Sequence, residues 1–165
     1  MTTDQQTLWD KIKDFELDEP TSSLTFTNRL ARENGWTIEY SIRAVHEYKK
    51  FIFMLCIADH SLTPSDQVDQ VWHLHLLYTQ SYWVDFCKNT IDKQIHHGPT
   101  KGGKAEGDKY NDLYEKTLQL YKTLFERNAP DDIWPPKEIR FGEVNFQRVN
   151  LDRNWIIKKP SMFKS

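Results

Sequence analysis

The sequence predicts a mainly α-helical protein: a compact bundle of four to five helices around a central buried helix at about residues 66–90. A short extended or β-hairpin segment is expected at the C-terminus. Apolar residues recur at three- and four-residue spacing along most of the chain, and clusters of Gly, Pro and Ser separate these runs. A length of 165 residues with 38% hydrophobic residues suits a single domain over 1–165, in which 136–165 forms an extended wrap.

Three helices are predicted in the first part of the chain, each from apolar spacing and from residues that begin or end helices. They cover residues 4–15, 24–33 and 38–58. Pro20 lies in the connection between the first two, and Ser23 is the expected N-cap of the second. Gly35 should end the second helix, and Thr37 should cap the third.

The central helix is predicted to begin after Pro64-Ser65 and to contain the run DQVWHLHLLYT. Its apolar residues occupy nearly the whole circumference, which is typical of a helix buried inside its domain. The glycine-rich stretch 96–107 is expected to be a loop, and a further helix is predicted at about 107–127. Partial alternation from Ile139 onward indicates an extended strand or hairpin.

Composition limits the location and the class of partner. The N-terminus lacks the features of a signal peptide, and the longest apolar run, at 51–58, is far too short to span a bilayer. We therefore expect a cytoplasmic protein that does not enter membranes. A net charge of −2 argues against nucleic acid as the main partner.

Asp69 and His73 are the most informative polar residues of the predicted central helix. They are four positions apart, so their side chains should lie on one face, one turn from each other. His75 is two positions beyond His73, which places it about 200° around a regular helix. His75 is therefore a weaker candidate for a shared site and is expected to join the aromatic stripe.

A carboxylate and an imidazole at this spacing can share a divalent metal ion, with His96, His97 or Glu106 completing the ligand set from the following loop. Zinc is the first expectation, and iron or manganese are alternatives. A remaining coordination position would carry water, which suggests a metal-dependent hydrolase. Glu106, or alternatively Glu115, is the candidate catalytic base.

Two other functions fit the same sequence. Asp69 and His73 could form a structural pair in a non-catalytic module that docks onto another protein. Alternatively, residues 137–165 hold seven basic and three acidic residues interleaved with aromatics, a pattern that could serve an accessory protein binding nucleic acid.

The segment PSDQVDQVWHLHLLYTQSYWVDFC (64–87) resembles the signature of the glycine-rich domain-containing protein-like family. That signature has an Asp-x-x-Trp-His-x-His-like segment after a Pro-Ser turn, followed by a Tyr and an acidic residue near a Cys. The matching positions in this chain are Asp69, Trp72, His73, His75, Tyr82, Asp85 and Cys87. The resemblance covers about 38–136 and looks most like the bacterial branch. It implies a helical domain with a functional patch and specifies no activity, and the glycine-rich tail that names the family is not found in this sequence.

Overall fold

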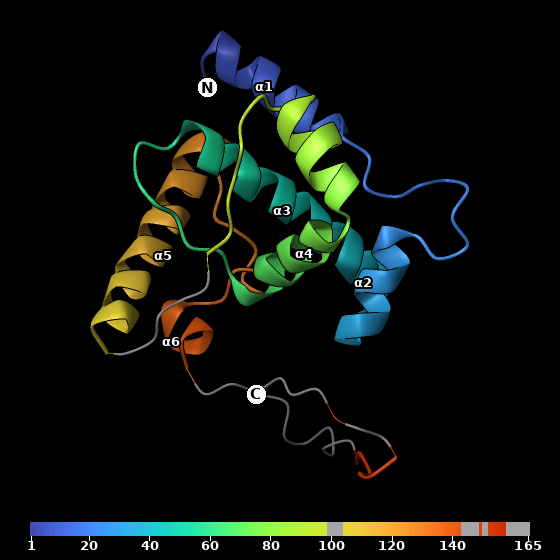
Figure 1. Ribbon diagram of the computed structural model, residues 1–165. Coiled ribbons are helices and arrows are strands. Elements are labelled where there is room, and N and C mark those ends of the chain that lie inside the picture. The colour runs from blue at the N-terminus through green and yellow to red at the C-terminus, as the bar shows by residue number, and fades with distance from the viewer. Residues whose placement is uncertain (99–103, 143–148, 150–151, 158–165) are drawn as a thin grey trace.

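A computed structural model describes residues 1–98, 104–142, 149 and 152–157, and within the second range it describes side chains from Tyr110 onward (Figure 1). The described part is helical and contains no strand, which confirms the predicted mainly α bundle. Its elements, in chain order, are α1 (Thr3–Asp14), α2 (Phe26–Asn34), α3 (Ile38–Ile57), α4 (Asp66–Leu77), the π-helix η1 (Gln80–Lys88), α5 (Lys104–Phe125) and α6 (Lys137–Arg140). Among the described helices, none combines the length and the apolar character that crossing a bilayer requires.

The helix at the centre of the bundle is α3, not the segment 66–90 that the sequence predicted. In Figure 1 α3 runs through the middle of the molecule, and it contacts α1, α2, α4 and α5. Four consecutive residues near its end, Phe51 to Met54, are fully buried, so this stretch is covered on all sides. By contrast, α4 exposes His73 and Leu77 and buries only one face.

The predicted helix 66–90 is divided in two at Tyr78. Ser65 caps α4 by accepting a hydrogen bond from the backbone of Val68, as its position before the helix suggested. At Tyr78 the backbone leaves the helical region (φ −87°, ψ 65°), and the chain resumes as a π-helix. Because a π-helix has a different repeat from an α-helix, residues after Tyr78 do not follow the 3.6-residue positions that the sequence pattern assumed.

The segment after α5 is partly helical. Ile139, predicted to be extended, lies in the short helix α6, where its backbone N–H bonds to the carbonyl of Pro136. The remainder of the predicted strand or hairpin falls mostly at 143–148, 150–151 and 158–165, outside the described residues.

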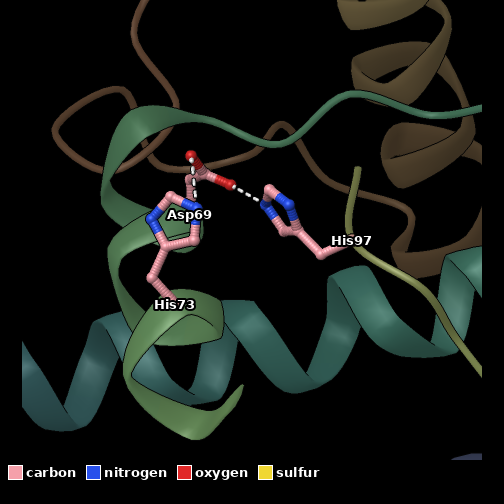
Figure 2. Close-up of side chains that lie close together, drawn as sticks. All are labelled: Asp69, His73 and His97. Carbon is pink, nitrogen blue, oxygen red and sulfur yellow. Dashed lines mark hydrogen bonds and ion pairs between the residues drawn. The ribbon is translucent and has the colours of Figure 1, made fainter. Parts of the chain in front are cut away.

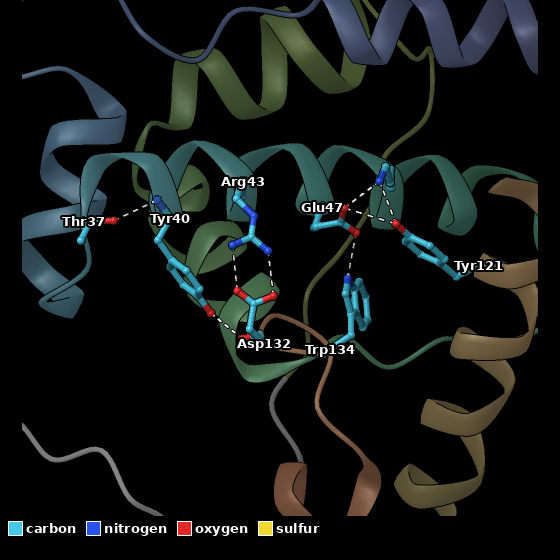
Figure 3. Close-up of polar contacts among 8 residues, drawn as sticks. Thr37, Tyr40, Arg43, Glu47, Tyr121, Asp132 and Trp134 are labelled. Atoms are coloured by element: carbon cyan, nitrogen blue, oxygen red, sulfur yellow. Dashed lines mark hydrogen bonds and ion pairs between the residues drawn. The ribbon is translucent and has the colours of Figure 1, made fainter. Parts of the chain in front are cut away.

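A buried polar network joins the middle of α3 to α5 and to the segment that precedes α6 (Figure 3). Glu47 accepts hydrogen bonds from Lys50 at 2.6 Å, from Tyr121 at 3.2 Å and from Trp134 at 3.0 Å. Lys50 also donates to the Tyr121 hydroxyl at 2.7 Å. Nearer the surface, Arg43 and the carboxylate of Asp132 form a two-point ion pair at 2.7 and 2.8 Å.

Burial of Glu47 and Lys50 was not apparent from the sequence, because charged residues on a helix usually mark its solvated face. Their partners, Tyr121 and Trp134, lie more than seventy positions away, so no local pattern reveals them. The network satisfies both charges and connects α3 to α5 and to the segment that precedes α6.

Candidate metal centre

Asp69, His73 and His97 come together alongside the first two turns of α4 (Figure 2). The Nε2 atom of His97 lies 2.7 Å from Oδ1 of Asp69, and Nε2 of His73 lies 3.8 Å from Oδ2 of the same carboxylate. One ligand atom from each residue fits within a group whose members all lie within 4.8 Å of one another. Within the part of the chain that the structure describes, this is the one such group of three His, Cys, Asp or Glu residues.

The helix places two of these residues by its ordinary repeat. Asp69 lies in the first turn of α4, which Ser65 caps, and its backbone N–H bonds to the carbonyl of Ser65. His73 follows one turn later on the same face, which is the juxtaposition predicted from the four-residue spacing.

The third residue, His97, comes from the segment that follows η1 and faces α4 from the side (Figure 2). The His97 ring also packs edge-on against the indole of Trp72, with 4.4 Å between centroids. The side chains of His97 and Asp69 are 17% and 18% exposed, while that of His73 is 50% exposed. Two side chains of the cluster, Asp69 and His97, are therefore largely buried, and the third, His73, is accessible to solvent.

This donor set can hold a divalent transition metal. Imidazole nitrogens and carboxylate oxygens bind such ions at about 2.0–2.2 Å, so donors sharing an ion lie roughly 3–4 Å apart. Separations of up to 4.8 Å require only small side-chain rotations to reach that geometry. Binding would also replace the direct Asp69–His97 hydrogen bond, because Nε2 of His97 must present a lone pair to the ion.

The structure places His75 elsewhere, in the core. Its Nδ1 lies 2.8 Å from the hydroxyl of Tyr48 and its Nε2 lies 3.2 Å from that of Ser81, so both ring nitrogens have partners. Burial lowers the pKa of His75 to about 3, which keeps the ring neutral. These contacts agree with the geometric argument that His73 and His75 point to different sides of the helix.

The remaining predicted residues are not part of the cluster or cannot be placed. His96 is exposed, and its ring lies 5.3 Å from that of Trp83. Glu115, the alternative base, forms an ion pair with Lys137 at 2.5 Å. Glu106 belongs to the first turn of α5, but its side chain lies outside the described residues.

From the sequence, His96 and His97 were equal candidates for the third ligand. The neighbouring residue Ile95 nevertheless carried a signal that favours His97. Ile95 is buried, His96 is exposed and His97 is largely buried, as expected for an extended segment in which alternate side chains point the same way. An apolar residue at 95 thus indicates that 97, rather than 96, faces the protein.

The described fold is a small helical domain in which a carboxylate–histidine cluster lies between α4 and the segment after η1. Residues 17–120 match the UCP032817-like family, and the chain belongs to that family. It is also 31% identical over 87 residues to glycine-rich domain-containing protein 1 of Arabidopsis thaliana, a match that covers 50% of this chain. The resemblance expected from the Trp-His segment is confirmed.

The matched region spans only 10% of the Arabidopsis protein, so this chain corresponds to a small part of that relative. No solved structure matches the chain.

Proposed function

We propose that this protein binds a divalent transition-metal ion through Asp69, His73 and His97. The observation that carries the proposal is the convergence of one carboxylate and two imidazoles from two separate segments within 4.8 Å. Two of these groups are four positions apart on α4, and the third is brought to them across 28 positions of sequence.

The ligand types narrow the choice of metal. Two histidines and one carboxylate suit zinc in sites that keep an open position, and the same set binds iron in non-haem oxygenases. Zinc is therefore the first candidate, with iron and manganese as alternatives. Three protein ligands leave at least one coordination position for water, and a metal lowers the pKa of such a water enough to make it a nucleophile near neutral pH.

Hydrolysis of a bound substrate is the reaction class that this chemistry favours. The exposed side of His73 supports that idea, since a substrate can approach the ion only from solvent. A base from the protein is not required when the metal itself supplies hydroxide.

A non-catalytic interaction module is the second candidate, and the short Asp69–His97 hydrogen bond favours it. At 2.7 Å this bond joins α4 to the segment after η1 without any ion, so it can act as a structural link. Under this alternative the cluster stabilises the fold, and a partner protein docks elsewhere.

Calorimetric titration of tag-free, chelator-treated protein separates the two candidates when it is carried out with zinc, with manganese and, under anaerobic conditions, with ferrous iron. We expect one ion per chain, and we expect Asp69→Ala, His73→Ala and His97→Ala each to weaken binding by at least tenfold. His96→Ala is the matched control, because it removes an exposed imidazole next to His97 and should leave the affinity unchanged. Wild-type protein that binds none of the three metals would overturn the proposal and would leave the Asp69–His97 hydrogen bond as a structural link between segments.

A further inference from the structure

The hydroxyl of Tyr82 joins the two segments that supply the candidate ligands. Tyr82 is fully buried, and its oxygen accepts a hydrogen bond from the indole N–H of Trp72 at 2.9 Å. The same hydroxyl donates to the backbone carbonyl of Ile95 at 2.6 Å. Trp72 directly precedes His73 in α4, and Ile95 lies two positions before His97.

The segment that carries His97 depends on contacts of this kind because it has no regular structure of its own. Residues 94–98 belong to no helix. Earlier in the connection, Lys93 is tied to the end of α3 through hydrogen bonds to the carbonyls of Leu55 and Cys56. Closer to His97, the backbone is held by the Tyr82 hydroxyl and by burial of the Ile95 side chain.

The break in the predicted helix explains how Tyr82 reaches this position. Tyr82 lies in η1, which begins shortly after the backbone leaves the α-helical region at Tyr78. The backbone N–H of Tyr82 bonds to the Tyr78 carbonyl at 2.8 Å. π-Helical segments are rare in proteins and occur frequently at functional sites. In this protein the π-helix carries the side chain that connects Trp72 to Ile95.

We propose that Tyr82 is a positioning residue that holds the His97 imidazole in reach of Asp69 and His73, and so sets the affinity of the site for its metal ion. This inference rests on the proposed metal-binding function. The Trp72 indole also helps to position His97, because its N–H bonds to Tyr82 and its ring packs directly against the His97 ring.

Tyr82→Phe tests the proposal by removing one oxygen atom and keeping the ring. Loss of a hydrogen bond made directly to a metal-ligating group typically costs about 10- to 100-fold in affinity. Because Tyr82 acts one step further out, through Ile95, we expect the zinc dissociation constant to rise by about tenfold, the lower end of that range. Tyr114→Phe is the matched control. Tyr114 is also fully buried, and its hydroxyl donates to the carbonyl of Pro135 at 2.7 Å, so the same atom is lost from the same kind of bond.

A double-mutant cycle distinguishes positioning from general stability. If Tyr82 acts through His97, then Tyr82→Phe should weaken zinc binding strongly in the wild-type background and hardly at all in His97→Ala. A loss of equal size in both backgrounds overturns the proposal. Trp72→Phe is a second variant; it removes the indole N–H, keeps the Tyr82–Ile95 bond, and should give a smaller loss.

A second measurement requires no metal and therefore separates this inference from the proposed function. The ring signals of His97 in the NMR spectrum, assigned from the His97→Ala variant, should shift or broaden in Tyr82→Phe and remain unchanged in Tyr114→Phe. Unchanged His97 signals in Tyr82→Phe overturn the positioning role. Absence of zinc binding by the wild type together with shifted signals overturns the metal site and retains the positioning of His97.

Discussion

The imidazole of His75 and the hydroxyl of Tyr48 meet at 2.8 Å in the core, although the two residues are 27 positions apart. The phenol is completely buried, and its hydroxyl is best satisfied as a donor to Nδ1 of the ring. The proton of the neutral imidazole then lies on Nε2, which donates to the Ser81 hydroxyl at 3.2 Å. In this tautomer His75 cannot take a proton from Ser81, so the arrangement links α3, α4 and η1 and does not activate the serine.

Acid should destabilise the protein through His75. Its pKa is about 3 in the folded state because of burial, and 6.5 is the ordinary value expected for the unfolded chain. Between these values the unfolded chain binds one more proton, so the free energy of unfolding falls as pH decreases from about 6.5 toward 3. The contribution has a slope of up to about 1.4 kcal/mol per pH unit, measurable by urea unfolding at several pH values.

The His75→Gln variant isolates this contribution, because carboxylates also titrate at the acid end of the range. Glutamine remains neutral, so the variant should show a shallower dependence of stability on pH between 6 and 4. It should also lose about 1–3 kcal/mol at pH 7, because the imidazole that bonds both to the buried Tyr48 hydroxyl and to the half-buried Ser81 hydroxyl is removed. His96→Gln removes an exposed imidazole and should retain the wild-type slope; equal slopes in all three proteins would contradict the assignment to His75.

Local signals in the sequence were enough to predict most of the helices. Thr37 accepts a hydrogen bond from the backbone of Tyr40 and starts α3 at the predicted residue. Gly35 ends α2 in a left-handed conformation, as its place after Asn34 indicated. The N-cap of α2 is Thr25 and not the predicted Ser23, a difference of two residues between side chains of the same capping chemistry.

Features that depend on tertiary partners could not be predicted in this way. Hydrophobic spacing continues through Tyr78, so it gives no sign that the α-helix ends there. The pairing of Asp69 with His73 follows from helix geometry, whereas the choice of His97 depends on an irregular segment held by distant residues. The sequence therefore predicted the Asp69–His73 pair and included His97 among the possible third ligands, whereas the contact of His97 with Asp69 depends on the fold.

The buried Glu47–Lys50 pair should be sensitive to loss of one partner and more tolerant of loss of both. The two side chains are 7% and 2% exposed, and burial lowers the pKa of Lys50 while the Glu47 carboxylate opposes that shift. Lys50→Met leaves Glu47 without its cation and should cost about 3–5 kcal/mol of unfolding free energy. The double variant Glu47→Gln/Lys50→Met should recover part of that loss in urea unfolding experiments.

The Arg43–Asp132 pair provides the comparison at the surface. Its side chains are 51% and 49% exposed, so solvent screens the interaction despite its two-point geometry. Arg43→Met should cost no more than about 1 kcal/mol. Similar losses for Arg43→Met and Lys50→Met would contradict the view that burial makes the Glu47 network critical.

Substitution of Gly35 should lower the free energy of unfolding for a conformational reason alone. Its φ of +65° is a left-handed conformation, and an added Cβ would meet nothing within 4 Å. Gly35→Ala should therefore cost about 1–2 kcal/mol through backbone strain without a steric clash. Gly98→Ala also adds a Cβ in open space and lacks the positive φ, so an equal loss in this control would argue against the conformational explanation.

Zinc should raise the melting temperature of the wild-type protein if Asp69, His73 and His97 share an ion. A ligand that binds only the folded state adds about 2.7 kcal/mol at a hundred times its dissociation constant. For a chain of this length, that corresponds to a shift in Tm of roughly 5–10 °C. A chelator should reverse the shift, and calorimetry with and without the metal measures it.

Two variants test whether the thermal shift arises from an ion bound at the cluster. Asp69→Asn preserves the size of the side chain and removes the charge that a divalent ion requires, so its Tm should not respond to zinc. His96→Ala should respond like the wild type, because His96 lies outside the cluster among the described residues. Zinc responses of equal size in Asp69→Asn and the wild type would place the ion at another site, since a carboxamide in place of Asp69 cannot supply the negative charge that holds it between the two histidines.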